Sequence, residues 1–203
     1  MLITAVEPRR KALSALYIDG EYAMKLSTET LMENRICPGT ELDDEQLHRL
    51  VEESDLRRAK EKALWLISYR DHSSKELFDK LRRDFSEEAA HKALLRMEEL
   101  GLIDDEKFAV KYAAELRSKH QSPQNIKYKL TQKGISKELC DTIIEDLDID
   151  PREEISALIE RTYLRALSDE KGVRRTIAAL QRAGFRWGDI RAVMDEYIHE
   201  EYD

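Results

Sequence analysis

Histidine and cysteine are the residue types in this sequence best suited to metal binding or nucleophilic chemistry. The histidines are His48, His72, His91, His120 and His199. No two of them stand at the i, i+4 spacing that brings two metal ligands to one face of a helix. Solvent-facing or capping roles therefore explain these histidines better than a metal site does.

The cysteines and serines also lack a catalytic pattern. Cys37 and Cys140 are far apart and neither belongs to a Cys-x-x-Cys motif, so we expect no disulfide framework and a reducing, cytoplasmic compartment. Ser68 and Ser118 have no nearby arrangement of histidine and acid. Glycine-rich phosphate-binding motifs do not occur. We therefore predict a protein that is not an enzyme, with no catalytic residue, cofactor, metal or small-molecule substrate.

Basic residues are concentrated in three stretches, although the net charge is −8. The stretches are residues 70–83, 116–137 and 171–191, and the middle one contains no Asp or Glu. We predict that they form a partner-binding surface. Its candidate residues are Arg70, Lys75, Lys80, Arg82 and Arg83 in the first stretch, Arg117, Lys119, Lys127, Lys129 and Lys133 in the second, and Arg174, Arg175, Arg182 and Arg186 in the third.

A solvated helix face is the ordinary explanation for one basic stretch. Recurrence at equivalent places favours a binding surface instead, because stacked units would align the stretches into one stripe. The partner is either a nucleic-acid backbone, through counterion release, or an acidic protein groove, and charge alone does not distinguish them. Core packing is the expected role of the aromatic residues Tyr69, Tyr112, Tyr128, Tyr163 and Trp187.

The composition is typical of a helix-rich protein, because the chain is 37% charged, 41% hydrophobic and has only seven glycines and four prolines. We therefore expect helices to position the basic residues. From Leu56 onward, capping residues predict about nine helices of roughly 10 to 17 residues. The predicted helix starts follow Ser73, Ser86, Asp104, Ser122-Pro123 and Asp150-Pro151, and the predicted stops are Gly101, Gly134 and Gly184. No apolar run is long enough to span a membrane, so a soluble protein without a targeting segment is expected.

The N-terminal residues 2–27 alternate as strands do, and Asp19-Gly20 between apolar runs predicts a β-hairpin with a type I′ turn. The hairpin is expected to pack through Leu16, Ile18, Met24 or Leu26. After Pro38-Gly39, one helix is predicted from Asp43-Asp44 and a separate one from about Leu56.

The sequence repeats itself at a shift of about fifty residues. The segment 130–135 aligns with 180–185, and 81–85 matches both with one residue missing. In the following helix the apolar positions coincide on one face, which indicates an internal repeat. These positions are Ala90, Cys140 and Ile190; Ala93, Ile143 and Val193; Leu94, Ile144 and Met194; Met97, Leu147 and Tyr197.

The predicted fold is therefore mainly α-helical: three tandem three-helix repeats in an elongated, curved array, preceded by a small N-terminal β-hairpin segment. The expected divisions are 1–55 for the hairpin and a linking helix, then 56–103, 104–149 and 150–203 for the three repeats.

Specific strings resemble the RecX family. Ser68-Tyr69-Arg70 with Leu77 and Leu81, followed by the run Leu100-Gly101-Leu102-Ile103-Asp104-Asp105-Glu106-Lys107-Phe108-Ala109, is similar to the first RecX repeat and its junction with the second. The resemblance covers about residues 58–198. Asp84-Phe85 departs from it, because a Lys-Gly-Phe type of ending is usual there.

A monomer is the simplest expectation for the oligomeric state. The resemblance implies a regulator that lies in the groove of the RecA filament on DNA and limits filament growth, ATP hydrolysis and strand exchange. It also implies contact with single-stranded or filament-bound DNA and no membrane association. An alternative is a transcription factor with helix-turn-helix units, whose second helix enters the major groove. A weaker alternative is a structural scaffold in which the basic stretches are solvated and inert.

Overall fold

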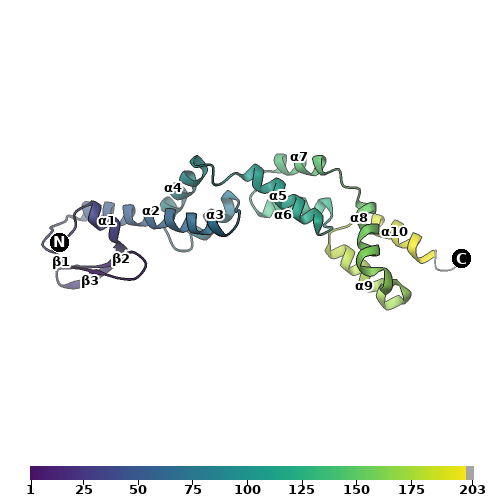
Figure 1. The fold of residues 1–203 in the computed structure, drawn as a ribbon, viewed down its shortest axis with the longest axis horizontal. Helices are drawn as coiled ribbons and strands as arrows, with labels where there is room; N and C mark the ends of the chain where they lie inside the picture. The colour runs from purple at the N-terminus through teal and green to yellow at the C-terminus, as the bar shows by residue number, and fades with distance from the viewer. Residues whose placement is uncertain (200–203) are drawn as a thin grey trace. The chain divides into compact units, whose positions relative to one another are not determined.

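The computed structural model of the protein describes residues 1–199 (Figure 1). Over these residues the fold is mainly helical, with ten α-helices and one three-stranded antiparallel sheet, which confirms the predicted fold class. The chain forms two compact units, one of residues 1–104 and one that begins at Asp105.

The N-terminal sheet has the strand order β1 (Ile3–Pro8), β2 (Leu13–Ile18) and β3 (Glu21–Ser27). The β2–β3 turn has positive φ at both Asp19 (51°) and Gly20 (91°), as a type I′ turn requires, so the predicted hairpin is confirmed. Strand β1 extends it to a sheet. The sheet buries Leu16 and Leu26 against α1 (Thr28–Glu33) and α2 (Asp44–Tyr69), with Ile18 and Met24 partly buried at the same core.

Helix α2 is one continuous helix of 26 residues, so the predicted break near Leu56 is wrong. The helix starts at a capping box formed by Asp43 and Gln46, and no glycine or proline interrupts it. Its first half packs on the sheet through Leu50, and its second half buries Ala59 and Ala63 in a different core. Burial at both ends stabilises the helix across the expected boundary.

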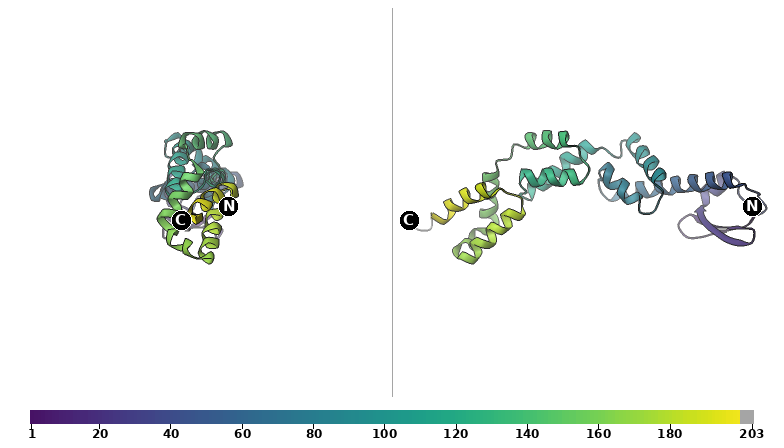
Figure 2. Two further views of the ribbon diagram at one scale, coloured as in Figure 1. Left: turned by 90° about the vertical axis from the view of Figure 1, so that its right-hand side faces the viewer. Right: turned by 180° about the vertical axis from the view of Figure 1, so that it is seen from behind.

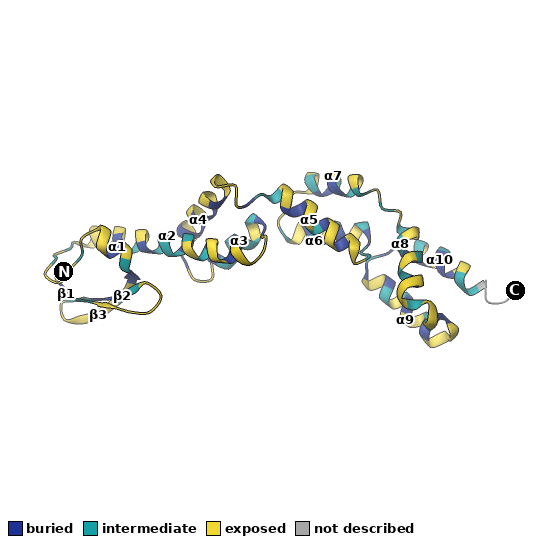
Figure 3. Ribbon diagram, viewed as in Figure 1, coloured by how far each residue is buried: buried dark blue, intermediate teal, exposed yellow. Residues whose placement is uncertain are grey.

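The rest of the first unit is a three-helix core made by the second half of α2, α3 (Ser74–Leu81) and α4 (Glu87–Glu99). Ser73 and Ser86 cap α3 and α4 by accepting hydrogen bonds from backbone N–H groups, as predicted. Helix α3 has eight residues and is shorter than predicted. Figure 3 shows that the buried faces of these helices turn toward one another.

The second unit contains two further three-helix cores. The first is formed by α5 (Asp105–Ser118), α6 (Pro123–Gln132) and α7 (Lys137–Leu147). The second is formed by α8 (Pro151–Leu158), α9 (Glu170–Arg182) and α10 (Trp187–His199). Between α8 and α9 the chain continues as a π-helical turn, η1 (Ile159–Tyr163), and a 3₁₀ segment, η2 (Leu164–Ser168). Helix α8 packs against α10, and η2 packs against α9 (Figure 2).

The positions that define the repeat form buried faces in all three cores. Ala90, Cys140 and Ile190 are each fully buried, as expected for equivalent positions. Gly134 and Gly184 end α6 and α9 with positive φ, whereas no residue from 82 to 85 has positive φ, so the first repeat ends its second helix differently. The predicted limit between residues 55 and 56 falls inside α2, and the division into 56–103, 104–149 and 150–203 stays a prediction.

Candidate partner-binding surface

Local ion pairs occupy most of the candidate basic residues in the first unit. Arg70 binds Glu76 through two parallel hydrogen bonds of 2.6 and 3.0 Å. Lys75 pairs with Asp79 within α3 at 2.6 Å. Arg82 lies 3.2 Å from a Glu87 oxygen. In the described part of the chain, Lys80 and Arg83 have no acidic partner.

In the middle repeat, too, some candidate bases form ion pairs and others do not. Lys119 pairs with Glu115 at 2.5 Å, Lys127 pairs with Asp141 of α7, and Arg117 lies 3.9 Å from Glu154 of α8. Two other bases contact uncharged groups: the Lys129 ammonium donates to the Gln121 side-chain oxygen at 3.1 Å, and the Lys133 ammonium lies 5.8 Å from the centre of the Tyr112 ring.

In the third repeat only one candidate has an ion pair among the described residues. Arg174 lies 3.2 Å from Glu170 within α9. The guanidinium of Arg182 donates to a backbone carbonyl, and that of Arg186 lies 3.4 Å from the side-chain oxygen of Gln124 in α6. Arg175 is exposed.

The structure thus divides the predicted surface into paired and available cations. Exposed ion pairs contribute only about 0–1 kcal/mol, so they weaken the positive field without removing it. The cations without an acidic partner in the described residues are Lys80, Arg83, Lys129, Arg175, Arg182 and Arg186. The alignment of all three stretches into one stripe stays a prediction.

Helix α6 and the end of α9 meet in a close junction. The backbone N–H of Ser122 donates to the carbonyl of Ala183 at 3.1 Å, and the Asn125 side-chain amide donates to the same oxygen at 3.3 Å. A Cβ atom on Gly184 would lie 2.7 Å from both the Asn125 Cβ and the Ser122 hydroxyl. Beside this junction lies a groove of about 360 Å³ lined by Lys127 and Arg186, among others.

A polar network that the sequence did not predict joins the segment after α5 to α8 and η1. His120 is only partly exposed, and its Nδ1 lies 2.7 Å from a carboxylate oxygen of Glu154. The guanidinium of Arg161 lies 3.2 Å from the His120 Nε2. Donation from Arg161 to Nε2 leaves Nδ1 as the donor to Glu154. No sequence spacing indicates this site, because its members lie 34 and 41 residues from His120.

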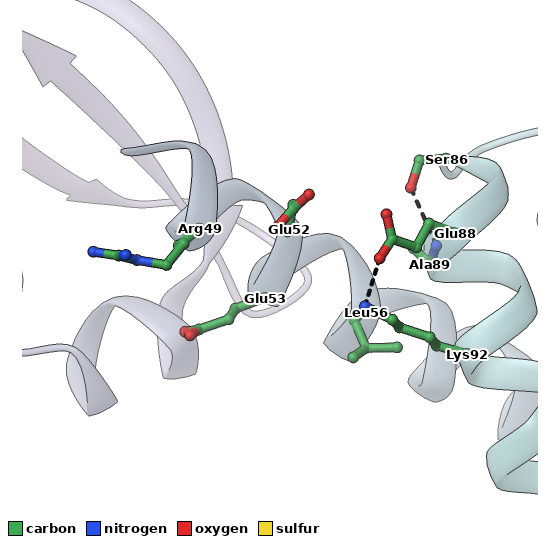
Figure 4. A pocket seen from close by; sticks show the side chains of 8 residues that line it. All are labelled: Arg49, Glu52, Glu53, Leu56, Ser86, Glu88, Ala89 and Lys92. Atoms are coloured by element: carbon green, nitrogen blue, oxygen red, sulfur yellow. Dashed lines mark hydrogen bonds and ion pairs between the residues drawn. The ribbon is translucent and has the colours of Figure 1, made fainter. Parts of the chain in front are cut away.

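A hollow of about 270 Å³ in the first unit lies between α2 and α4 (Figure 4). Arg49, Glu52 and Glu53 extend from α2, and Glu88 and Lys92 belong to α4. The hydrogen bond and ion pair with Lys92 lower the pKa of Glu88. Acids outnumber bases here, so this hollow does not extend the basic surface.

The prediction that the aromatic residues pack in cores is wrong for three of them. Tyr69, Tyr128 and Trp187 are 71%, 60% and 54% exposed. Tyr112 and Tyr163 are partly buried. Tyr128 lies on the side of α6 opposite its buried residues Ile126 and Leu130, so helical periodicity itself places this ring toward solvent.

No group of three or more His, Cys, Asp or Glu side chains suited to a metal ion occurs among the described residues. Cys37 is exposed and Cys140 is buried, and burial raises the pKa of the Cys140 thiol. Every helix over residues 1–199 is too short or too polar to cross a lipid bilayer.

Comparison with known proteins supplies the family. Residues 59–97 match the first three-helix domain of RecX, and residues 104–142 match the second. Regulatory protein RecX of Clostridium tetani is 28% identical over 202 residues, which cover 97% of this chain and 93% of that protein. The protein of the same name from Chlorobium phaeobacteroides is 35% identical over 146 residues, or 71% of this chain and 96% of the relative.

Solved structures agree with this assignment. A crystal structure of regulatory protein RecX has the same fold, with a TM-score of 0.61, 24% identity, and coverage of 96% of this chain and 98% of that chain. RecX from Lactobacillus salivarius gives a TM-score of 0.56 at 26% identity, over 70% of this chain and 96% of its own. On these similarities, the chain belongs to the RecX family of regulatory proteins.

Proposed function

We propose that the protein binds the RecA recombinase filament on DNA and inhibits its ATPase, filament extension and strand exchange, and so regulates DNA repair and recombination. Membership of the RecX family carries this proposal. Its action is binding rather than catalysis, without a cofactor and as a monomer.

Two cations on the second helices of the last two repeats provide the proposed contacts: Lys129, which is partly exposed, and Arg175, which is exposed. Lys129 on α6 and Arg175 on α9 have no acidic partner among the described residues, so binding an anionic surface breaks no ion pair at either position. Individual contacts of this kind are weak. Contacts from tandem repeats to adjacent filament subunits act together only on an assembled filament, which gives preference for the filament over free RecA. We propose that the bound chain competes with a second DNA strand for the filament groove.

The test reverses the charge of Lys129 and Arg175 together, to Glu. RecA ATP turnover on single-stranded DNA is measured against increasing amounts of the protein at physiological salt. The wild type should inhibit turnover. The double variant should need about tenfold more protein for half inhibition, a difference of about 1.4 kcal/mol.

The matched control reverses two cations outside the surface, Lys60 on α2 and Arg165 on η2, because it changes the net charge equally. Circular dichroism and melting temperature should stay near wild type in both variants. Unchanged inhibition by Lys129→Glu/Arg175→Glu would contradict the proposed surface, and a wild type without effect on RecA would contradict the proposed function. The family assignment does not favour the transcription-factor alternative, and tight sequence-specific binding to duplex DNA without RecA would revive it.

A further inference from the structure

A cleft of about 540 Å³ in the first unit is not part of the predicted basic surface. The turn between β1 and β2 forms one side with Lys11, α2 forms another with Lys62 and Trp65, and Phe85 closes it after α3. Its volume lies within the roughly 300–1,000 Å³ of small-ligand sites. Three segments far apart in sequence thus meet around one opening.

The turn holds Lys11 in an unfavourable backbone conformation. Lys11 and Ala12 both have positive φ, 61° and 53°, a region that side-chain-bearing residues rarely adopt. Backbone hydrogen bonds from Arg9 to Leu13 (2.7 Å) and from Thr28 to Ala12 (2.9 Å) hold the turn in this shape. Strain maintained in this way is common at ligand contacts.

The exposed ring of Trp65 stands on the α2 side of the cleft, with the ring of Tyr69 beside it. Trp65 lines it and is 55% exposed, and Tyr69, one helical turn later, packs edge-on against Trp65 with ring centres 4.7 Å apart. Exposure of two large rings costs hydrophobic free energy unless a partner covers them. An indole with a fixed neighbour is a suitable platform for a stacked base.

The charges around the cleft favour an anion at the turn. Arg58 lies 3.4 Å from Asp55, and Lys62 pairs with Asp84, so these cations are compensated, and Glu61 adds one acid to the lining. Arg10 and Lys11 are exposed and have no acidic partner among the described residues. Available positive charge therefore lies on the turn, across the cleft from the aromatic wall.

We propose that this cleft binds single-stranded nucleic acid, with one unstacked base on Trp65 and the adjoining phosphates at Arg10 and Lys11. A cation beside an exposed indole matches the alternation of phosphate and base along a single strand. Duplex DNA does not fit, because its bases are already stacked on one another. The site is separate from the repeat surface and requires no RecA.

The test uses tryptophan fluorescence of the full chain. The protein contains two tryptophans, so Trp187→Phe leaves Trp65 as the only indole. Titration with oligothymidylate of about 8 nucleotides, a length typical of single-strand sites, should quench Trp65 to saturation. Anisotropy of a labelled oligonucleotide reports total binding in parallel. Trp65→Ala should weaken binding about tenfold, as loss of one stacked base does.

Charge variants complete the test. Arg10→Gln with Lys11→Gln should weaken binding several-fold and reduce its salt dependence, whereas Lys60→Gln, which lines a different hollow on α2, should not. Circular dichroism checks folding of each variant. Binding with unchanged Trp65 emission, or no binding, overturns the proposal. Equal quenching by duplex DNA or by oligoglutamate of the same charge overturns the assignment to single-stranded nucleic acid. RecA inhibition is measured separately, so neither result decides the proposed function.

Discussion

His72 is a buried histidine in the turn between α2 and α3. It is 3% exposed, its Nδ1 lies 2.8 Å from the Arg70 carbonyl, and its Nε2 has no hydrogen-bond partner in the described structure. Burial lowers the pKa of His72 because the protonated ring would lose its hydration. The sequence indicated a solvent-facing or capping histidine, and spacing alone does not reveal burial of this kind.

The lowered pKa makes stability depend on pH. The unfolded chain takes up a proton at His72 below about pH 6.5 while the folded chain keeps it neutral, so stability is complete above that pH and falls as the pH decreases toward the folded pKa. Urea unfolding at pH 7.5 and 5.5 should show a larger loss for wild type than for His72→Gln, by up to about 1.4 kcal/mol. His91→Gln, at an exposed site, should keep the wild-type loss. Equal losses in all three proteins would count against this role.

Thr176 of α9 presents a second buried polar atom. Its side chain is fully buried, but the hydroxyl has no partner in the described structure. Thr176→Val keeps the shape and removes the unsatisfied group, so the free energy of unfolding should rise by about 1 kcal/mol. Thr142→Val, at an exposed hydroxyl that donates to the Glu138 carbonyl, should change it by less than about 0.5 kcal/mol. Urea denaturation measures both, and destabilisation by Thr176→Val would point to a hidden donor or water.

At the scale of elements, capping residues predicted helix starts well because a cap acts within four residues. Ser122 and Asp150 each accept a hydrogen bond from the first turn of their helix, with proline at its start. The break near Leu56 was predicted wrongly because the stability of α2 depends on two distant cores. Gly184 was predicted to end a helix, and it does, but its close approach to Asn125 depends on a contact 59 residues away and was not predictable.

A pair of glycine variants separates the cost of positive φ at Gly184 from the cost of its close approach to Asn125. Gly184 and Gly101 both have positive φ, 88° and 66°, but a Cβ at Gly101 meets nothing within 4 Å. Gly101→Ala should lower the free energy of unfolding by about 1–2 kcal/mol through backbone strain alone. Gly184→Ala should lose about 1–3 kcal/mol more, because the α6–α9 junction must move. Urea denaturation compares each variant with wild type. Equal losses of unfolding free energy in the two variants would show that the α6–α9 junction accommodates the added Cβ without further destabilisation.

At the scale of the whole molecule, periodicity and the internal repeat were sufficient to predict the fold class, and the family was indicated by the resemblance of specific strings such as residues 100–109. The charge pattern indicated where cations gather but not which are available. Lys127 and Arg117 are paired with Asp141 and Glu154, acids on other helices, and such pairings require the folded chain. The aromatic cleft was missed for the same reason, since Lys11 and Trp65 are 54 positions apart and each is unremarkable in its own segment.

The continuity of α2 constrains how this part of the chain can change in length. Each residue inserted in an α-helix turns everything beyond it by about 100° and advances it by about 1.5 Å. Leu50 and Ala63 of α2 lie in separate cores, so one extra residue between them would rotate the β-sheet away from the phase that its packing requires. Insertions of seven residues, close to two full turns, restore the phase. Length variation along α2 is therefore tolerated in near-integral turns, while the loops at its ends accept single residues.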